Sequence, residues 1–168
     1  MNEKIKKEIR IDLLIIAITV IVFFILTNFV FKISNVKGHS MEDSLHENDR
    51  CLSFYYDLNN IERFDIVVID VSSEKELVKR VIGLPNEEIE YKDNKLYVNG
   101  KYIEEEFLDN DAITSDFKVI LKDNEYYCLG DNRTNSNDSR FYGPINKDSI
   151  VSSHIFRFYP FNRIGFMK

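Results

Sequence analysis

The sequence has few of the residues on which several common classes of protein depend. It contains two cysteines, three histidines, three prolines, six glycines and no tryptophan among 168 residues. Two cysteines cannot form a disulfide scaffold, and no C-x-x-C pair is present, so we expect neither a metal nor another cofactor. The low glycine and proline contents exclude a collagen-like chain. The net charge of −6 argues against nucleic acid as the main partner.

The overall composition is that of a folded protein. Hydrophobic residues make up 44% and charged residues 30%, which excludes general disorder. The length suffices for one domain and leaves little for a second. Charge is spread unevenly, because residues 1–10 carry four basic and two acidic side chains, whereas Asp12 is the one charged residue between 11 and 31.

A long apolar run follows the basic N-terminus. Residues 13–31 carry no charge and would span roughly 28 Å as a helix, close to the thickness of the hydrocarbon core of a bilayer. The run is apolar on every side, unlike a core helix, and no A-x-A-like trio follows it, unlike a cleaved signal peptide. We therefore predict a retained, single-pass anchor in the cell membrane, with the lipid bilayer as a partner.

The charges around this run predict its orientation. Basic residues collect at the cytoplasmic ends of membrane spans. The predicted organisation is a cytoplasmic N-terminus over residues 1–10, a transmembrane anchor over 11–31 and an extracellular domain over 32–168.

Beyond residue 32 the pattern changes to short strands. Alternating runs rich in β-branched and aromatic residues predict strands at 51–56, 64–71, 76–82, 88–92, 95–98, 118–121, 125–129 and 150–159. Asn99-Gly100 predicts a type I′ hairpin turn. No amphipathic helix of three turns is indicated past the anchor, so we expect a mainly β, barrel-like domain.

One of these strands carries two cations among apolar residues. In residues 76–82 the pleat puts Lys79 on one face and Arg80 on the other, and apolar residues flank both. A strand covered on both faces would bury at least one of them, and burial lowers the pKa of a lysine. A neutral lysine amine can act as a general base toward a serine hydroxyl such as that of Ser40. Taken alone, the pattern favours a lysine whose ammonium reaches water.

The densest polar run covers residues 130–140. It follows the apolar end of the predicted strand 125–129 and contains two arginines and two aspartates. Runs of this kind are commonly solvated loops. The paired charges also suit an internal network of ion pairs that holds a loop in one conformation.

The histidines and cysteines are not expected to take part in chemistry. His39, His46 and His154 lack metal-ligand spacing and an obvious carboxylate partner, so we interpret them as surface or structural residues. Cys51 and Cys128 both fall in predicted strands. An exported domain permits a disulfide between them, but free buried thiols are favoured.

Four blocks of the sequence together resemble the type I signal peptidases, in the short, single-anchor form of Gram-positive bacteria. In chain order they are Ser-Met-Glu-Asp-Ser-Leu at 40–45, Arg-Phe-Asp-Ile-Val-Val at 63–68, Lys-Arg-Val-Ile-Gly-Leu-Pro at 79–85 and the polar run at 130–140. With the anchor they cover nearly the whole chain, and the last two are long and specific. The resemblance implies a serine endopeptidase with a Ser/Lys dyad, in a β-rich domain with a partly apolar surface on the membrane.

The resemblance also implies a role for each matching residue. Ser40 matches the nucleophile, with its backbone N–H in the oxyanion hole, and Lys79 matches the general base. Ser136 matches a serine whose hydroxyl orients the lysine amine. The residues that match those holding the site together are Asp131, Arg133, Asp138 and Arg140. Those at the substrate pocket are Met41 and Leu45.

Several positions depart from the family pattern. Asp43 stands where proline is usual, and Ser44 stands where threonine is usual. Asn48 and Asn86 stand where glycine is usual. Gly38 stands where some relatives carry a hydroxyl residue that adds an oxyanion donor. These are supporting positions, so they bear on rate and local stability more than on reaction type.

The implied function is removal of signal peptides from secretory preproteins at small-residue, A-x-A-like sites. Two alternatives stay open at this point: a Ser/Lys peptidase dedicated to one pilin-like or conjugation substrate, and a non-catalytic β module that binds partners in the cell envelope. The aromatic run at 156–161 fits either a core strand or a belt at the membrane interface.

Overall fold

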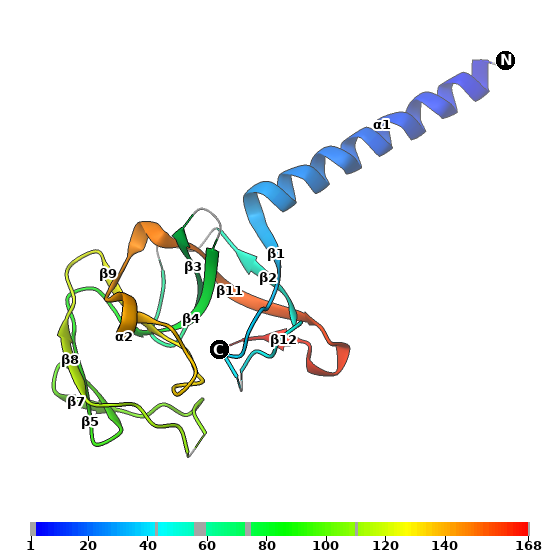
Figure 1. Ribbon diagram of the computed structural model, residues 1–168. Coiled ribbons are helices and arrows are strands. Elements are labelled where there is room, and N and C mark those ends of the chain that lie inside the picture. The colour runs from blue at the N-terminus through cyan, green and yellow to red at the C-terminus, as the bar shows by residue number, and fades with distance from the viewer. Residues whose placement is uncertain (1–2, 43, 56–59, 73–74, 110, 168) are drawn as a thin grey trace.

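The computed structural model describes residues 3–42, 44–55, 60–72, 75–109 and 111–167. A long helix, α1 (Glu3–Ile25), continues as a π-helical turn (Leu26–Val30) and projects away from a body of β-strands (Figure 1). It is the one described helix that is long and apolar enough to cross a membrane. The hydroxyls of Thr19 and Thr27 donate to carbonyls four residues earlier, each over 2.9 Å, so these polar groups are satisfied inside the helix.

Most of the body is an eight-stranded antiparallel sheet. Its strands are β1 (Phe31–Asn35), β2 (Arg50–Phe54), β3 (Ile66–Ser72), β4 (Lys75–Gly83), β9 (Glu125–Leu129), β10 (Ile145–Asn146), β11 (Ile150–Tyr159) and β12 (Gly165–Phe166). The order is β1-β2-β11-β3-β4-β9-β10, and β12 pairs with β11. The long strand β11 thus joins the N-terminal pair β1–β2 to the central pair β3–β4.

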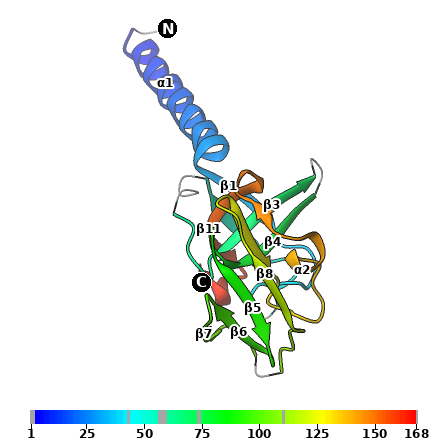
Figure 2. The ribbon, with the colours of Figure 1, turned by 90° about the vertical axis from the view of Figure 1, so that its left-hand side faces the viewer.

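A smaller sheet is inserted between β4 and β9. Its strands are β5 (Glu88–Lys92), β6 (Lys95–Val98), β7 (Lys101–Ile103) and β8 (Phe117–Ile120), in the order β7-β6-β5-β8. It forms the end of the body away from α1 (Figure 2). Asn99 and Gly100 have φ angles of 50° and 77°, as a type I′ turn requires, so the predicted hairpin is confirmed.

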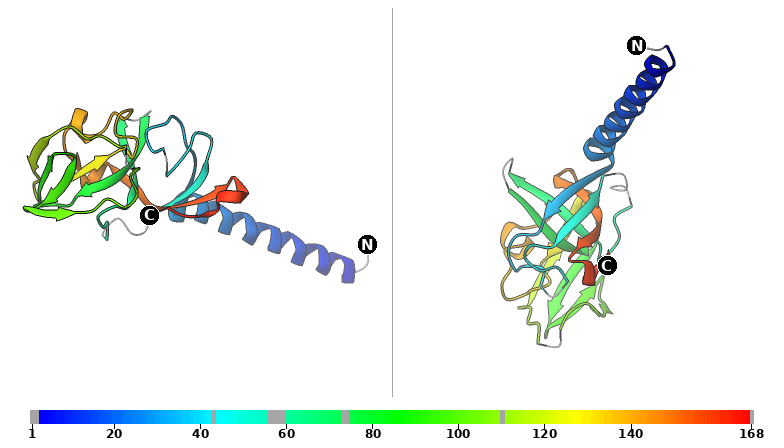
Figure 3. Two further views of the ribbon diagram at one scale, coloured as in Figure 1. Left: turned by 90° about the horizontal axis from the view of Figure 1, so that it is seen from below. Right: turned by 90° about the vertical axis from the view of Figure 1, so that its right-hand side faces the viewer.

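The mainly β fold is confirmed, but its sheets are open. Within the described residues β1 and β10 end the larger sheet, and β7 and β8 end the smaller one, so the barrel-like expectation is not met. Closure would require β1 to pair with β10, a two-residue strand at the opposite end of the path. The described segments outside the sheets include a short helix, α2 (Ser139–Tyr142), and two 3₁₀ turns at 147–149 and 161–163 (Figure 3).

All eight predicted strands are present, with ends shifted by at most two residues. The last predicted residue of the strand 51–56 lies outside the described residues. Four short strands were not predicted: β1, which was assigned in part to the anchor, and β7, β10 and β12. The run at 156–161 begins in β11, which makes its first part a sheet strand.

The larger sheet is buried on both faces. Val67 and Ile69 of β3 lie in one apolar cluster with Cys128, whereas Ile66 and Val68 lie in another with Cys51. Both cysteines are buried and free, as favoured from the sequence. A third cluster fills the space between the smaller sheet and β9. Coverage of both faces is what brings charged residues of β4 into the interior.

Candidate active site

A cleft of about 640 Å³ lies between β1 and β4. One wall is formed by residues 32–38, directly after the helical segment, and the other includes residues 76–79 of β4. Both Ser40 and Lys79 line it. The cleft therefore joins the end of the anchor to the serine and the lysine that the sequence singled out.

Ser40 sits in a turn that apolar neighbours hold in place. Met41 and Leu45, 2% and 0% exposed, belong to the apolar cluster between β2, β3 and β11. The Leu45 backbone N–H donates to the Met41 carbonyl over 2.8 Å, and the Asn132 N–H donates to the Ser40 carbonyl over 3.1 Å. Packing on one side and the 130–140 segment on the other thus fix the Ser40 backbone.

Lys79 reaches this serine from the middle of β4. Its side chain is buried, with the residue 2% exposed, and Nζ lies 2.7 Å from Ser40 Oγ and 2.8 Å from the Val78 carbonyl oxygen. The neighbouring Arg80 is 0% exposed, so the strand buries both of its cations. A buried amine at hydrogen-bond distance from a hydroxyl has the geometry of a base and its nucleophile.

Gly130 brings the polar run against the dyad. A Cβ on Gly130 would lie 2.2 Å from Ser136 Oγ and 2.4 Å from the Ser40 carbonyl oxygen, so this position has room for hydrogen alone. Ser136 Oγ is buried beside it, close enough to Asp138 to help lower the pKa of that carboxylate. The structure therefore puts Ser136 next to Ser40.

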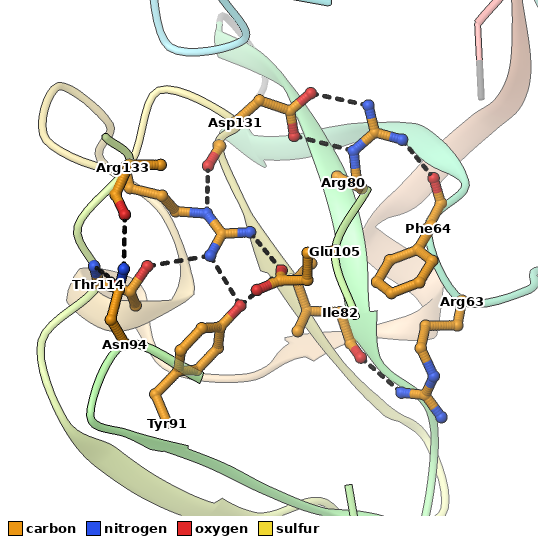
Figure 4. A network of polar contacts seen from close by, with 12 residues as sticks. Arg63, Phe64, Arg80, Ile82, Tyr91, Asn94, Glu105, Thr114, Asp131 and Arg133 are labelled. Carbon is orange, nitrogen blue, oxygen red and sulfur yellow. Dashed lines mark hydrogen bonds and ion pairs between the residues drawn. The ribbon is translucent and has the colours of Figure 1, made fainter. Parts of the chain in front are cut away.

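A buried ion pair joins β4 to the start of the polar run. Arg80 donates through Nε and Nη2 to the two carboxylate oxygens of Asp131, over 2.9 and 2.7 Å (Figure 4). Arg80 also donates to the Phe64 carbonyl and to Ser44 Oγ, and its guanidinium lies 4.0 Å from the centre of the Phe107 ring. Ser44 thus supplies its hydroxyl where a threonine was expected.

Arg133 ties the same run to the inserted sheet. It donates to the Gly130 carbonyl and to three side chains of the insertion, Tyr91, Thr114 and Glu105, over distances of 2.6–3.0 Å (Figure 4). Burial raises the pKa of the Tyr91 hydroxyl, which therefore stays protonated and donates to Glu105. The predicted network exists, but its anchoring partners come largely from outside residues 130–140.

Asp138 and Arg140 form hydrogen bonds within the polar run at 130–140. The Gly130 N–H donates to Asp138 Oδ2, and Arg140 donates to both carboxylate oxygens of Asp138 and to the Arg133 carbonyl. Although burial alone would raise the pKa of Asp138, the hydrogen bonds from Arg140 and Gly130 lower it. The carboxylate is thus held ionised beneath the glycine that contacts Ser40.

One sequence interpretation needs correction, and another stays untested. His39 does have a carboxylate partner, because its Nδ1 lies 2.7 Å from Glu42 Oε1 one turn away, and this contact raises the pKa of the imidazole. Leu45 was assigned with Met41 to the substrate pocket. Met41 lines the cleft, and Leu45 lies in the same buried cluster, so its place at the pocket stays a prediction.

Comparison with known proteins gives one consistent result. The family described as "Signal peptidase, peptidase S26" matches residues 9–159. The chain is 35% identical to signal peptidase IB of Staphylococcus aureus (strain COL), over 94% of this chain and 93% of that protein. It is 37% identical to signal peptidase I S of Bacillus subtilis (strain 168), over 89% of this chain and 88% of that one.

This chain belongs to the signal peptidase family, peptidase S26. A solved signal peptidase I from Enterococcus faecalis V583 has the same fold, with a TM-score of 0.51 and 33% identity over 56% of this chain and 96% of that structure. The chain is accordingly a serine endopeptidase with a membrane-anchoring helix, and its function implies secretory preproteins as substrates.

Two departures from the signal peptidase pattern have a structural explanation. Asn48 and Asn86 have φ angles of 69° and 66°, in the left-handed region that favours glycine. Asparagine tolerates this region better than other residues that carry a Cβ, so the usual glycine can be replaced here at modest cost. Asp43 lies outside the described residues.

Gly38 is expected to require glycine for its backbone conformation. Its φ is +80°, and nothing lies within 4 Å of the position of an added Cβ. Gly38→Ser in this signal peptidase should therefore lower stability by about 1–2 kcal/mol through backbone strain, without a steric clash. Thermal unfolding together with kcat measures this effect. Gly165→Ala is the matched control, because that site is equally open and lacks the positive φ. A raised kcat with an unchanged melting temperature would instead place a serine hydroxyl beside the reacting carbonyl.

Proposed function

We propose that Ser40 is the nucleophile and Lys79 the general base of this signal peptidase. The observation that carries the proposal is the 2.7 Å separation of Lys79 Nζ and Ser40 Oγ, at a site where the lysine is buried. Burial disfavours the charged ammonium, and only the neutral amine can accept a proton. None of the three histidines lines this cleft, so the lysine is the base at hand.

The reaction then runs in two balanced steps. In the first, Ser40 Oγ attacks the carbonyl carbon of the scissile bond while its proton passes to Lys79, and Lys79 gives that proton to the departing amine. An ester joins Ser40 to the signal peptide. In the second step Lys79 takes a proton from water, the hydroxide attacks the ester, and the proton returns to Ser40 Oγ. The negative oxygen formed in each step accepts a hydrogen bond from the Ser40 backbone N–H.

The supporting residues act by holding this geometry. Ser136 presents a buried hydroxyl beside Gly130, close to the dyad, and its role is to orient the lysine amine. Asp131 holds Arg80, the neighbour of Lys79. Arg133, Asp138 and Arg140 fix the loop around Gly130. These are positioning residues, since the contacts described above join them to other parts of the chain.

The cleft suits an extended peptide. Residues 76–79 pair with β3 on one side. Because β9 pairs with β4 only from Arg80 to Gly83, their other side is an edge without a strand partner in the described part of the chain. β1, across the cleft, is the end strand of its sheet. A substrate segment can add to such edges through backbone hydrogen bonds, and small side chains before the cut would fit against Met41. This arrangement favours A-x-A-like sites.

The membrane arrangement follows from the charges and the helix. We propose that residues 1–10 are cytoplasmic, 11–31 cross the bilayer and 32–168 form the extracellular catalytic domain. Exposed apolar side chains near the C-terminus, Phe161, Ile164 and Phe166, would then rest on the lipid surface. Anchoring also raises the effective concentration of a membrane-tethered preprotein at the site.

The decisive experiment uses the purified full chain in detergent with several unrelated secretory preproteins that carry A-x-A-like sites. A general signal peptidase should cut all of them after the small residue, and Ser40→Ala should cut none. Cleavage of one preprotein alone would favour a dedicated processing peptidase. Absence of cleavage by the wild-type chain, with binding of envelope proteins retained, would favour the non-catalytic module.

A further inference from the structure

The part of the cleft nearer the anchor contains buried polar atoms without a hydrogen-bond partner among the described residues. Ser34 Oγ and Asp70 Oδ1 are both buried, and neither has a hydrogen-bond partner in the described part of the chain. Both residues line the cleft that holds Ser40 and Lys79. Ser34 comes from β1 and Asp70 from β3, so the two walls each contribute one such atom.

The charges at this place are not balanced. Glu76, directly opposite Asp70 in the β3–β4 pairing, forms an ion pair with Lys32 of β1. No ion pair is found for Asp70 among the described residues, and its Oδ1 is shielded from solvent. A buried carboxylate oxygen without a donor is costly, and proteins usually satisfy such atoms with water or a ligand. A donor that enters the cleft would remove this cost.

The distance from the dyad indicates which part of a substrate reaches these atoms. Glu76 precedes Lys79 by three residues, so Glu76 and the facing Asp70 lie about 10 Å from the lysine along the strand. The Lys32–Glu76 pair puts them toward the anchor, which is the side from which a signal peptide leaves the bilayer. An extended peptide cut at Ser40 would bring its fourth or fifth residue before the cut to this point.

We propose that Ser34 and Asp70 form a subsite for a hydrogen-bond donor on the signal peptide, a hydroxyl, carboxamide or ammonium at the fourth or fifth residue before the cut. The inference rests on the proposed function and adds to it a polar determinant of substrate choice. Such a site would favour glutamine or lysine over leucine at that position, because leucine leaves both buried oxygens unsatisfied.

The test uses the full chain in detergent and one preprotein in which the fourth and fifth residues before the cut are changed in turn to leucine, glutamine or lysine. At one of the two positions, wild-type kcat/KM should be about tenfold higher with glutamine or lysine than with leucine, as expected for one hydrogen bond to a charged group. Asp70→Ala should bring this preference close to one, and Ser34→Ala should reduce it. Asp123→Ala, an exposed aspartate outside the cleft, should keep it.

Each outcome decides the matter. A wild-type enzyme that cuts the leucine, glutamine and lysine substrates equally well overturns the subsite and leaves the proposed function intact. An Asp70→Ala enzyme that loses rate equally on all three shows that Asp70 is structural and that the two oxygens only hold water. If Asp70→Ala does not fold, Asp70→Asn replaces it, and an unchanged preference for lysine over leucine overturns the proposal. Failure of the wild type to cut any substrate overturns the proposed function as well.

Discussion

Lys79→Arg should abolish cleavage, although the substitution keeps a long, basic side chain in β4. An arginine stays protonated and cannot accept the proton of the Ser40 hydroxyl, whereas a buried lysine amine can lose its charge. We expect kcat to fall by at least about 10³-fold for Lys79→Arg and for Ser40→Ala, and the double variant to be no slower than either single one. Initial rates on a preprotein in detergent measure this.

The controls for this prediction separate chemistry from folding. Lys122→Arg changes an exposed lysine that pairs with Glu125 at the surface, so its rate should equal that of the wild type. Circular dichroism should show that each variant keeps its β structure. In the wild type, kcat should increase with pH as the amine of Lys79 loses its proton. A Lys79→Arg enzyme with near-normal turnover would rule out the lysine as base.

Arg80→Met should cost about 3–5 kcal/mol of unfolding free energy, the largest loss of stability that we expect from a single substitution. The variant leaves the Asp131 carboxylate, 1% exposed, without its bidentate partner in the interior. The reference is Lys122→Met, which breaks an exposed pair and should cost no more than about 1 kcal/mol. Denaturant unfolding of the full chain in detergent compares the two.

A double variant shows whether the loss of stability in Arg80→Met comes from the unpaired charge of Asp131. Arg80→Met combined with Asp131→Leu removes both ions, so it should recover part of the stability that Arg80→Met alone loses. It would also show whether the pair is needed for activity, because Arg80 adjoins Lys79 and Asp131 adjoins Gly130. If Arg80→Met lowers the free energy of unfolding by less than about 1 kcal/mol, the buried Arg80–Asp131 ion pair does not stabilise the fold as we expect.

The local pattern of residues predicted the strands and turns well, because these depend on near neighbours. Alternation fixes which face a side chain takes, and Asn99-Gly100 suits the positive φ angles of its turn. The same alternation predicted that one of the two cations of β4 is buried, but taken alone it favoured a Lys79 ammonium that reaches water. β1 was missed because Phe31 continues an apolar run without a break, although the helical segment ends at Val30.

The partners of the charged residues could not be predicted in this way. Arg80 meets Asp131, 51 residues away, because β4 and β9 pair across an inserted sheet. Glu105 reaches Arg133 from an irregular segment after β7 that no local pattern marks. Such contacts depend on how distant strands are registered, which periodicity does not report. The adjacency of Arg80 to Lys79, and its place on an apolar face, was the one local signal that it too is buried.

The short connection between the helix and Ser40, the proposed nucleophile, limits where the proposed reaction can take place. Ser40 follows the last helical residue, Val30, by ten residues, of which the first five form β1. Fully extended, ten residues reach no more than about 36 Å, so the serine stays within that height of the point where the helix ends. A preprotein whose own apolar segment ends at the same bilayer surface must span the same height with the chain before its cut. The anchor thus limits the distance of the cleavage site from the membrane surface. The distance of that site from the substrate's N-terminus is not limited in this way.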